Sequence, residues 1–152
     1  MLIVASAAVA FAWNAMRDEP LPFAGSLDPP ALPEEGADLP ADPADVAVAQ
    51  WVEGAIFVDV RPREEYEIAR VSGALSLDAT EFDRRYFEVV APIGTNAPLF
   101  LYGAGPDSHV VRRVAAKLLA YEHTEVRLAA CGLACLRNAG IDVVSGPGEG
   151  MP

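Results

Sequence analysis

The sequence predicts an α/β domain with a mostly parallel five-stranded sheet flanked by helices, and three observations carry this prediction. From residue 42 to residue 146, short runs rich in β-branched and aromatic residues alternate with segments of helical periodicity. The run 99–102 is apolar at every position, which is typical of a strand that a parallel sheet buries on both faces. A glycine-rich loop at residues 103–108 follows this run and leads into a helix, a connection typical of α/β proteins.

The first half of the domain is expected to begin with a helix. Asp42 is a candidate N-cap with Pro43 at the first helical position, and Gly54 is expected to end this helix. A β-rich run at 55–60 predicts a strand, and a turn and short helix follow from residue 61. Ser72 and Gly73 indicate a turn before a short strand at 74–77.

The second half continues the alternation of helices and strands. Residues 78–81 resemble a capping box and start a helix that ends before Pro92. After the strand at 99–102, apolar residues at helical spacing predict a helix over 110–121, with Ser108 as its N-cap. The last elements are a strand at 125–130 and a helix at 133–138.

The first 16 residues are nearly all apolar and carry no charged side chain, which predicts an apolar N-terminal helix. Such a helix would span about 24 Å, short of the roughly 30 Å of a hydrocarbon core. A membrane anchor is the favoured interpretation, because Trp13 and Asn14 suit a membrane–water interface. A secretory signal, which normally has a basic first segment, and a buried helix of the folded domain are the alternatives.

The chain therefore divides into four parts: an anchor or signal segment at 1–16, a linker at 17–41, the folded domain at 42–146 and a tail at 147–152. The linker is rich in proline and acidic residues, a composition that favours an extended, solvated segment. With an anchor or a signal, the domain would face the periplasm or the cell exterior.

The net charge of −11 and the pI of about 4.4 argue against nucleic acid as a partner. The two cysteines, Cys131 and Cys135, are too few for a disulfide framework and do not indicate a compartment.

Several motifs in order resemble the rhodanese-like family over about residues 42 to 146. The matching segments are Asp59-Val60-Arg61, Glu65-Tyr66, Ser72-Gly73-Ala74, Tyr102-Gly103, Cys131-Gly132 and Ala139-Gly140. The resemblance implies a loop after residue 102 whose backbone N–H groups face a thiolate and a bound anion. In the family's sulfurtransferases, a cysteine directly after this strand takes sulfur from a donor such as thiosulfate and passes it on as a persulfide.

The loop of this chain departs from that pattern. Its residues are Gly103, Ala104, Gly105, Pro106, Asp107 and Ser108. Gly103 stands at the nucleophile position when residues are counted from the strand, and Gly105 when they are counted back from the helix. No cysteine occurs before residue 131, no arginine in the loop can hold an oxyanion, and the Asp107 carboxylate would repel thiosulfate. The resemblance therefore implies a degenerate active loop without a catalytic residue.

The only thiols leave three interpretations open. Cys131 stands where the family has the first glycine of a pair, at the carboxyl end of a strand, so it could present a displaced thiol to the same site. It could instead be a small buried residue in place of glycine or alanine. A disulfide or redox pair with Cys135 is the third interpretation, although the spacing of four residues is geometrically demanding.

Other polar residues are given structural roles. His109 and His123 fit no recognised zinc pattern with the cysteines, so neither a metal site nor a cofactor is expected. Asp59 and Arg61 are expected to fix the end of their strand and the turn that follows it.

These observations favour a catalytically inactive rhodanese-like domain that acts as a membrane-tethered binding or regulatory module. An unidentified protein or a small sulfur oxyanion is the expected partner. A sulfurtransferase or persulfide carrier that uses Cys131 is the alternative.

Overall fold

A computed structural model describes residues 39–105 and 108–147. The expectations for residues 1–16, for the linker up to residue 38 and for the last five residues lie outside this range. Within the described ranges, no helix is both long and apolar enough to cross a membrane.

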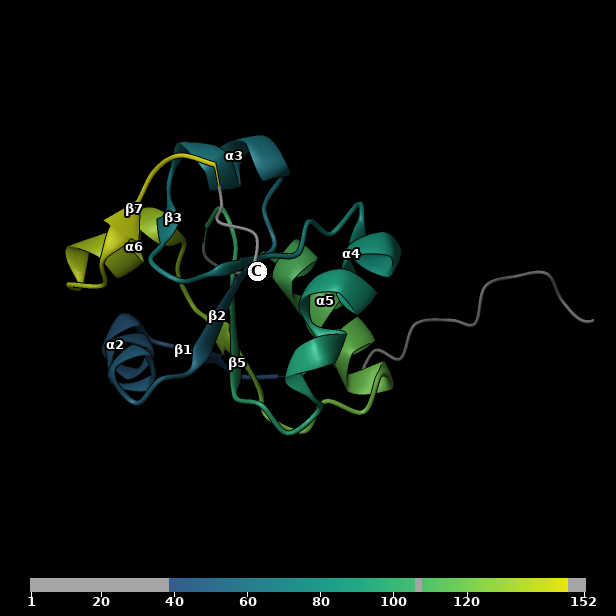
Figure 1. Ribbon diagram of the computed structural model, residues 1–152. Helices are drawn as coiled ribbons and strands as arrows, with labels where there is room; N and C mark the ends of the chain where they lie inside the picture. The colour runs from purple at the N-terminus through teal and green to yellow at the C-terminus, as the bar shows by residue number, and fades with distance from the viewer. Residues whose placement is uncertain (1–38, 106–107, 148–152) are drawn as a thin grey trace, which may run out of the picture. The chain divides into compact units, whose positions relative to one another are not determined.

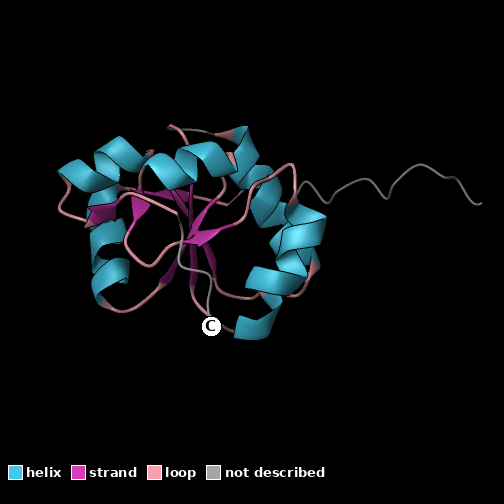
Figure 2. Cartoon of the chain, turned by 45° about the horizontal axis from the view of Figure 1, so that its top comes forward, coloured by secondary structure: helices cyan, strands magenta, loops and turns pink. Residues whose placement is uncertain are grey.

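The domain alternates strands and helices, as expected, around a five-stranded sheet (Figures 1 and 2). The strands are β1 (Ala41–Asp42), β2 (Ile56–Asp59), β3 (Arg70–Val71), β4 (Leu75–Ser76), β5 (Leu99–Tyr102), β6 (Val126–Ala129) and β7 (Val143–Val144). The helices are α2 (Ala44–Val52), α3 (Arg63–Ile68), α4 (Phe82–Val89), η2 (Ala91–Ile93), α5 (His109–Ala120) and α6 (Leu133–Asn138).

The large sheet has the strand order β1-β6-β5-β2-β4, and every neighbouring pair is parallel. β5 lies at its centre, where Leu101 is in register with Val58 of β2 and with Leu128 of β6. Parallel strands end at the same edge, so the loops that follow β2, β5 and β6 meet at one edge of the sheet. All four residues of β5 are buried, as predicted.

The two faces of the sheet carry two hydrophobic cores, because alternate side chains of each strand point to opposite faces. Leu99 and Leu101 of β5 pack in the core beneath α4 and α5. Phe100 and Tyr102 pack on the other face with α2, α3 and α6. Figure 1 shows α4 and α5 on one side of β2 and β5, with α2 and α6 on the other.

Two predicted helix caps are wrong. Asp42 does not cap α2: it belongs to β1, its carboxylate accepts two hydrogen bonds from Arg127 at 2.8 and 2.9 Å, and Pro43 takes the cap position. The capping box at residues 78–81 does not form, because Asp78 accepts hydrogen bonds from Thr80 and Glu81 makes no side-chain cap. Gly54, with φ of +90°, ends α2 as predicted.

A second, two-stranded sheet joins β3 and β7 in antiparallel pairing. Neither strand of this sheet was predicted from the sequence, and β1 of the large sheet was not predicted either. The segment after β7 is held by Arg70, which donates hydrogen bonds to the carbonyl oxygens of Gly146 and Pro147, while the Gly146 amide donates to the Glu67 carbonyl. β3 also contacts β2, and its Val71 amide donates a hydrogen bond to the Tyr102 hydroxyl at the end of β5.

Candidate functional site

The loop after β5 lies where the sequence places it, between the end of β5 and the start of α5. Gly103 is buried, Ala104 is exposed and Gly105 is partly exposed. Ser108 occupies the N-cap position of α5 as predicted, but its side chain makes no capping hydrogen bond. Pro106 and Asp107 lie outside the described residues.

Gly103 occupies a place with little room for a side chain. A Cβ atom at residue 103 would lie 2.7 Å from Cγ2 of Val111 and 3.3 Å from Oγ of Ser108. Val111 is itself buried in the core beneath α5. A larger residue at position 103 would therefore push against the first turns of α5.

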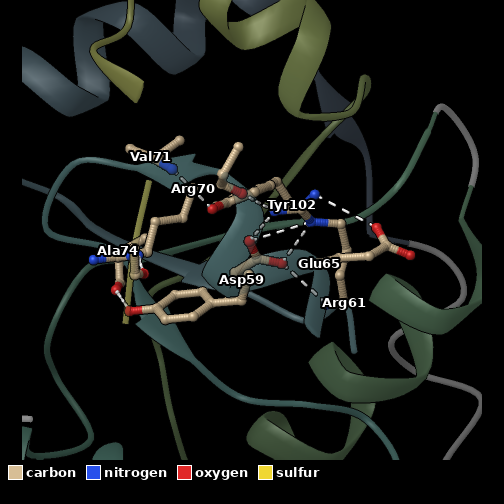
Figure 3. A network of polar contacts seen from close by, with 10 residues as sticks. Asp59, Arg61, Glu65, Arg70, Val71, Ala74 and Tyr102 are labelled. Atoms are coloured by element: carbon tan, nitrogen blue, oxygen red, sulfur yellow. Dashed lines mark hydrogen bonds and ion pairs between the residues drawn. The ribbon is translucent and has the colours of Figure 1, made fainter. Parts of the chain in front are cut away.

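At the end of β2, Asp59 and Arg61 form a buried ion pair (Figure 3). The Asp59 carboxylate accepts hydrogen bonds from the Arg61 backbone amide at 3.0 Å, from Nε at 2.9 Å and from a terminal nitrogen at 2.5 Å. The same guanidinium donates to the Ala69 carbonyl at 2.6 Å and lies 3.5 Å from the Glu65 carboxylate. The pair thus joins the end of β2 to both ends of α3, the structural role expected from the sequence.

The electrostatics of this pair favour the charged state. Burial alone would lower the pKa of Arg61, but the hydrogen bonds and the negative charge of Asp59 outweigh burial and raise it. The group therefore keeps its proton at any ordinary pH and is unsuited to proton transfer.

Tyr102, the last residue of β5, is fully buried beside this network. Its hydroxyl accepts a hydrogen bond from the Val71 backbone amide at 3.1 Å, which ties the central strand to β3. Burial, with the Asp59 charge nearby, raises the pKa of Tyr102 well above its ordinary value. The tyrosine is therefore neutral and structural.

Cys131 and Cys135 form a disulfide with their Cα atoms 5.9 Å apart. Of the three interpretations of these thiols, the structure has the disulfide, and neither cysteine is free. The turn between β6 and α6 brings the two sulfur atoms together across four residues. Both cysteines are partly exposed, and Cys131 packs at the border of the core on the α2 and α6 face of the sheet.

Gly132, between β6 and α6, contacts the backbone of the loop after β5. A Cβ atom at residue 132 would lie 2.7 Å from the carbonyl carbon of Ala104 and 2.9 Å from the amide nitrogen of Gly105. The disulfide segment and the loop are therefore adjacent. Sequence reasoning placed both at one sheet edge, but a backbone contact of this kind leaves no local signal beyond the glycine itself.

The two histidines differ in burial and in their contacts. His109 is exposed in the first turn of α5. His123 is 2% exposed, with its Nε2 3.1 Å from the Tyr86 hydroxyl, and none of the described residues forms a hydrogen bond with its Nδ1. Across the described ranges, no three histidine, cysteine or carboxylate side chains lie together as metal ligands.

With this geometry in place, comparison with known proteins identifies the class. A family model described as Rhodanese-like domain matches residues 42–138. The match covers more than half of the chain, and the chain belongs to this family. No curated protein shows a significant match to the sequence.

Solved structures share the fold at low sequence identity. The Alr3790 protein from Anabaena sp. is 19% identical with a TM-score of 0.60, and the match covers 69% of this chain and 92% of that one. The BH2092 protein from Bacillus halodurans is 20% identical with a TM-score of 0.56, covering 74% and 81%. A thiosulfate sulfurtransferase from Pseudomonas aeruginosa is 18% identical with a TM-score of 0.58, covering 71% of this chain but 20% of that one.

Proposed function

We propose that this chain is a catalytically inactive rhodanese-like domain that works as a membrane-tethered binding or regulatory module. The observation that carries the proposal is the buried Gly103 directly after Tyr102, at the position where the family's sulfurtransferases have their nucleophile. A persulfide enzyme needs a thiolate at that point. Glycine supplies none, and the packing around it leaves little room for a side chain.

The surroundings of the loop support the same conclusion. The buried polar groups at this sheet edge have structural partners: Arg61 donates to Asp59 and to the Ala69 carbonyl, and the Tyr102 hydroxyl accepts from the Val71 amide. Asp107 brings a negative charge to the loop, which disfavours a sulfur oxyanion such as thiosulfate. The scaffold is kept, while the groups that sulfur transfer requires are replaced.

The proposed role is binding by the loop edge, with a protein or a small sulfur oxyanion as partner. The anion is tested by thermal unfolding with sulfate and thiosulfate. An anion that binds the folded state raises the unfolding temperature with concentration, and a flat response for both anions leaves a protein partner as the proposal.

The membrane tether rests on residues 1–16 and on the proline-rich linker that follows. The Cys131–Cys135 disulfide supports placement in the periplasm or outside the cell, because disulfides persist mainly in oxidising compartments. Protease added to intact spheroplasts should degrade the domain, and the domain should sediment with membranes. A domain protected until the cells are lysed would contradict this placement.

The decisive experiment is a thiosulfate–cyanide sulfurtransfer assay of the full chain, with an active thiosulfate sulfurtransferase as positive control. We expect no turnover above that of a Cys131→Ala variant, whether or not the disulfide is reduced first. Turnover that Cys131→Ala abolishes would contradict the proposal.

The same outcome would favour the alternative function, a sulfurtransferase or persulfide carrier that uses Cys131. Its support is the backbone contact between Gly132 and the loop at Ala104 and Gly105, which brings this cysteine to the site. A carrier would first need the disulfide opened, because neither cysteine is free as the structure stands.

A further inference from the structure

We propose that the Cys131–Cys135 disulfide is a thiol–disulfide exchange site that accepts two electrons from a dithiol, and that its redox state alters the adjoining loop at Ala104 and Gly105. The proposal stands on the disulfide and its contacts, and it holds whether or not the domain transfers sulfur.

Accessibility favours exchange at this disulfide. Both cysteines are partly exposed, and Ala134 between them is exposed, so an incoming thiolate can reach the bond without unfolding the domain. Thiol–disulfide exchange depends on access of the attacking thiolate to a sulfur atom. A disulfide in the core would exchange only after unfolding.

Backbone hydrogen bonds and core packing hold the segment in place without the sulfur–sulfur bond. The amides of Cys135 and Leu136 donate to the Gly132 carbonyl at 3.0 and 3.2 Å, and the Ala139 amide donates to the Cys135 carbonyl at 3.0 Å. Leu136 is fully buried in the core beneath α6. The disulfide also closes a very short segment, so the stability lost on reduction lies at the low end for disulfides.

A backbone contact links this segment to the loop after β5. The residue next to Cys131 is Gly132, and its Cα hydrogen faces the Ala104 carbonyl and the Gly105 amide with no space for a methyl group. A small movement of residues 131–132 as the two sulfur atoms separate therefore changes the packing of the loop.

The reaction is balanced by the dithiol alone. One thiolate of the dithiol attacks a cysteine sulfur, the Sγ–Sγ bond breaks, and the other cysteine leaves as a thiolate that takes a proton from water. The second thiol of the dithiol, once deprotonated, attacks the mixed disulfide and releases the second cysteine. The products are two cysteine thiols and one oxidised dithiol, a transfer of two electrons.

A dithiol is favoured over a monothiol as the reductant because the leaving cysteine stays close. The backbone hydrogen bonds of α6 keep residue 135 beside residue 131, so its thiolate re-attacks a mixed disulfide and expels a monothiol. A dithiol escapes this reversal by closing its own ring. At equal thiol concentration, the ratio of reduced to oxidised protein should therefore be at least about ten-fold greater with dithiothreitol than with glutathione.

The experiment equilibrates the native, full-length chain with mixtures of reduced and oxidised dithiothreitol, or of reduced and oxidised glutathione, without denaturant. Acid quenching, alkylation and mass spectrometry then count the free thiols. We expect both thiols to appear together in the dithiothreitol series. Amide NMR shifts of Ala104 and Gly105 should change on reduction by more than those of β2, which serves as the internal control.

The variant Cys131→Ser/Cys135→Ser is the second arm. Its Ala104 and Gly105 signals should match the reduced wild type and should not respond to dithiothreitol. If this variant fails to fold, the chemically reduced wild type still decides the question. Reduction that requires denaturant, equal reduction by glutathione, or unchanged signals at Ala104 and Gly105 would each overturn the proposal.

Discussion

The role of Asp59 can be tested by removing its charge. In the variant Asp59→Asn, the side chain keeps its shape but the buried Arg61 guanidinium loses its shortest ion pair, with only the longer 3.5 Å contact to the half-exposed Glu65 carboxylate left. Asp59 is fully buried and Arg61 is 9% exposed, so solvent cannot replace the lost interaction. Breaking a buried pair on one side costs about 3–5 kcal/mol. We expect a loss of this size in the free energy of unfolding.

Urea unfolding followed by far-UV circular dichroism measures this loss. The midpoint should fall by roughly 1–3 M at an unchanged slope. Asp42→Asn is the matched control, because its pair with Arg127 is much more exposed and should contribute about 1 kcal/mol or less.

Replacing both partners separates the loss of one charge from the loss of the whole pair. Asp59→Leu combined with Arg61→Met replaces both charges by apolar groups, and it should cost less than Asp59→Asn alone. The structural assignment would be refuted if Asp59→Asn lowered stability no more than Asp42→Asn does.

Two further predictions concern packing and pH. Gly132→Ala should lower the free energy of unfolding by about 1–3 kcal/mol, because the added methyl group meets the backbone of Ala104. Gly105→Ala is the control and should change it little, because a Cβ atom there meets nothing within 4 Å. Equal urea midpoints for the two variants would contradict the contact. Burial lowers the pKa of His123, so the unfolded chain binds more protons than the folded chain below about pH 6.5. The contribution of His123 to stability is therefore full above about pH 6.5 and should fall, by up to about 1.4 kcal/mol per pH unit, as the pH drops toward the folded-state pKa. A His123→Asn variant that shows the same acid dependence would show that another group is responsible.

Local patterns were enough to predict most of the fold. Three predicted features depend only on neighbours in sequence, and each is observed: the buried strand β5, the helix that follows Ser108, and the end of α2 at Gly54. The chain order of strands and helices then restricts the sheet to parallel pairing. This is why the class of fold could be predicted without a structure.

The predictions are wrong or missing where the local structure depends on residues far away in sequence. Asp42 has the local pattern of a helix cap, but its backbone pairs with β6 and its carboxylate binds Arg127, 85 residues away in sequence. The pairing of β7 with β3 likewise has no local signal in so short a strand. The sequence could not choose among the three interpretations of Cys131 either, because the choice depends on the turn between β6 and α6.

The central claim, that this domain forms no catalytic persulfide, is tested most directly by intact-mass spectrometry of the full chain after incubation with thiosulfate, in the oxidised and in the dithiothreitol-reduced states. Removal of excess dithiothreitol before thiosulfate is added keeps the two reagents apart. We expect no added sulfur atom on either Cys131 or Cys135 in either state. A sulfur adduct on Cys131 that cyanide then removes would contradict this claim.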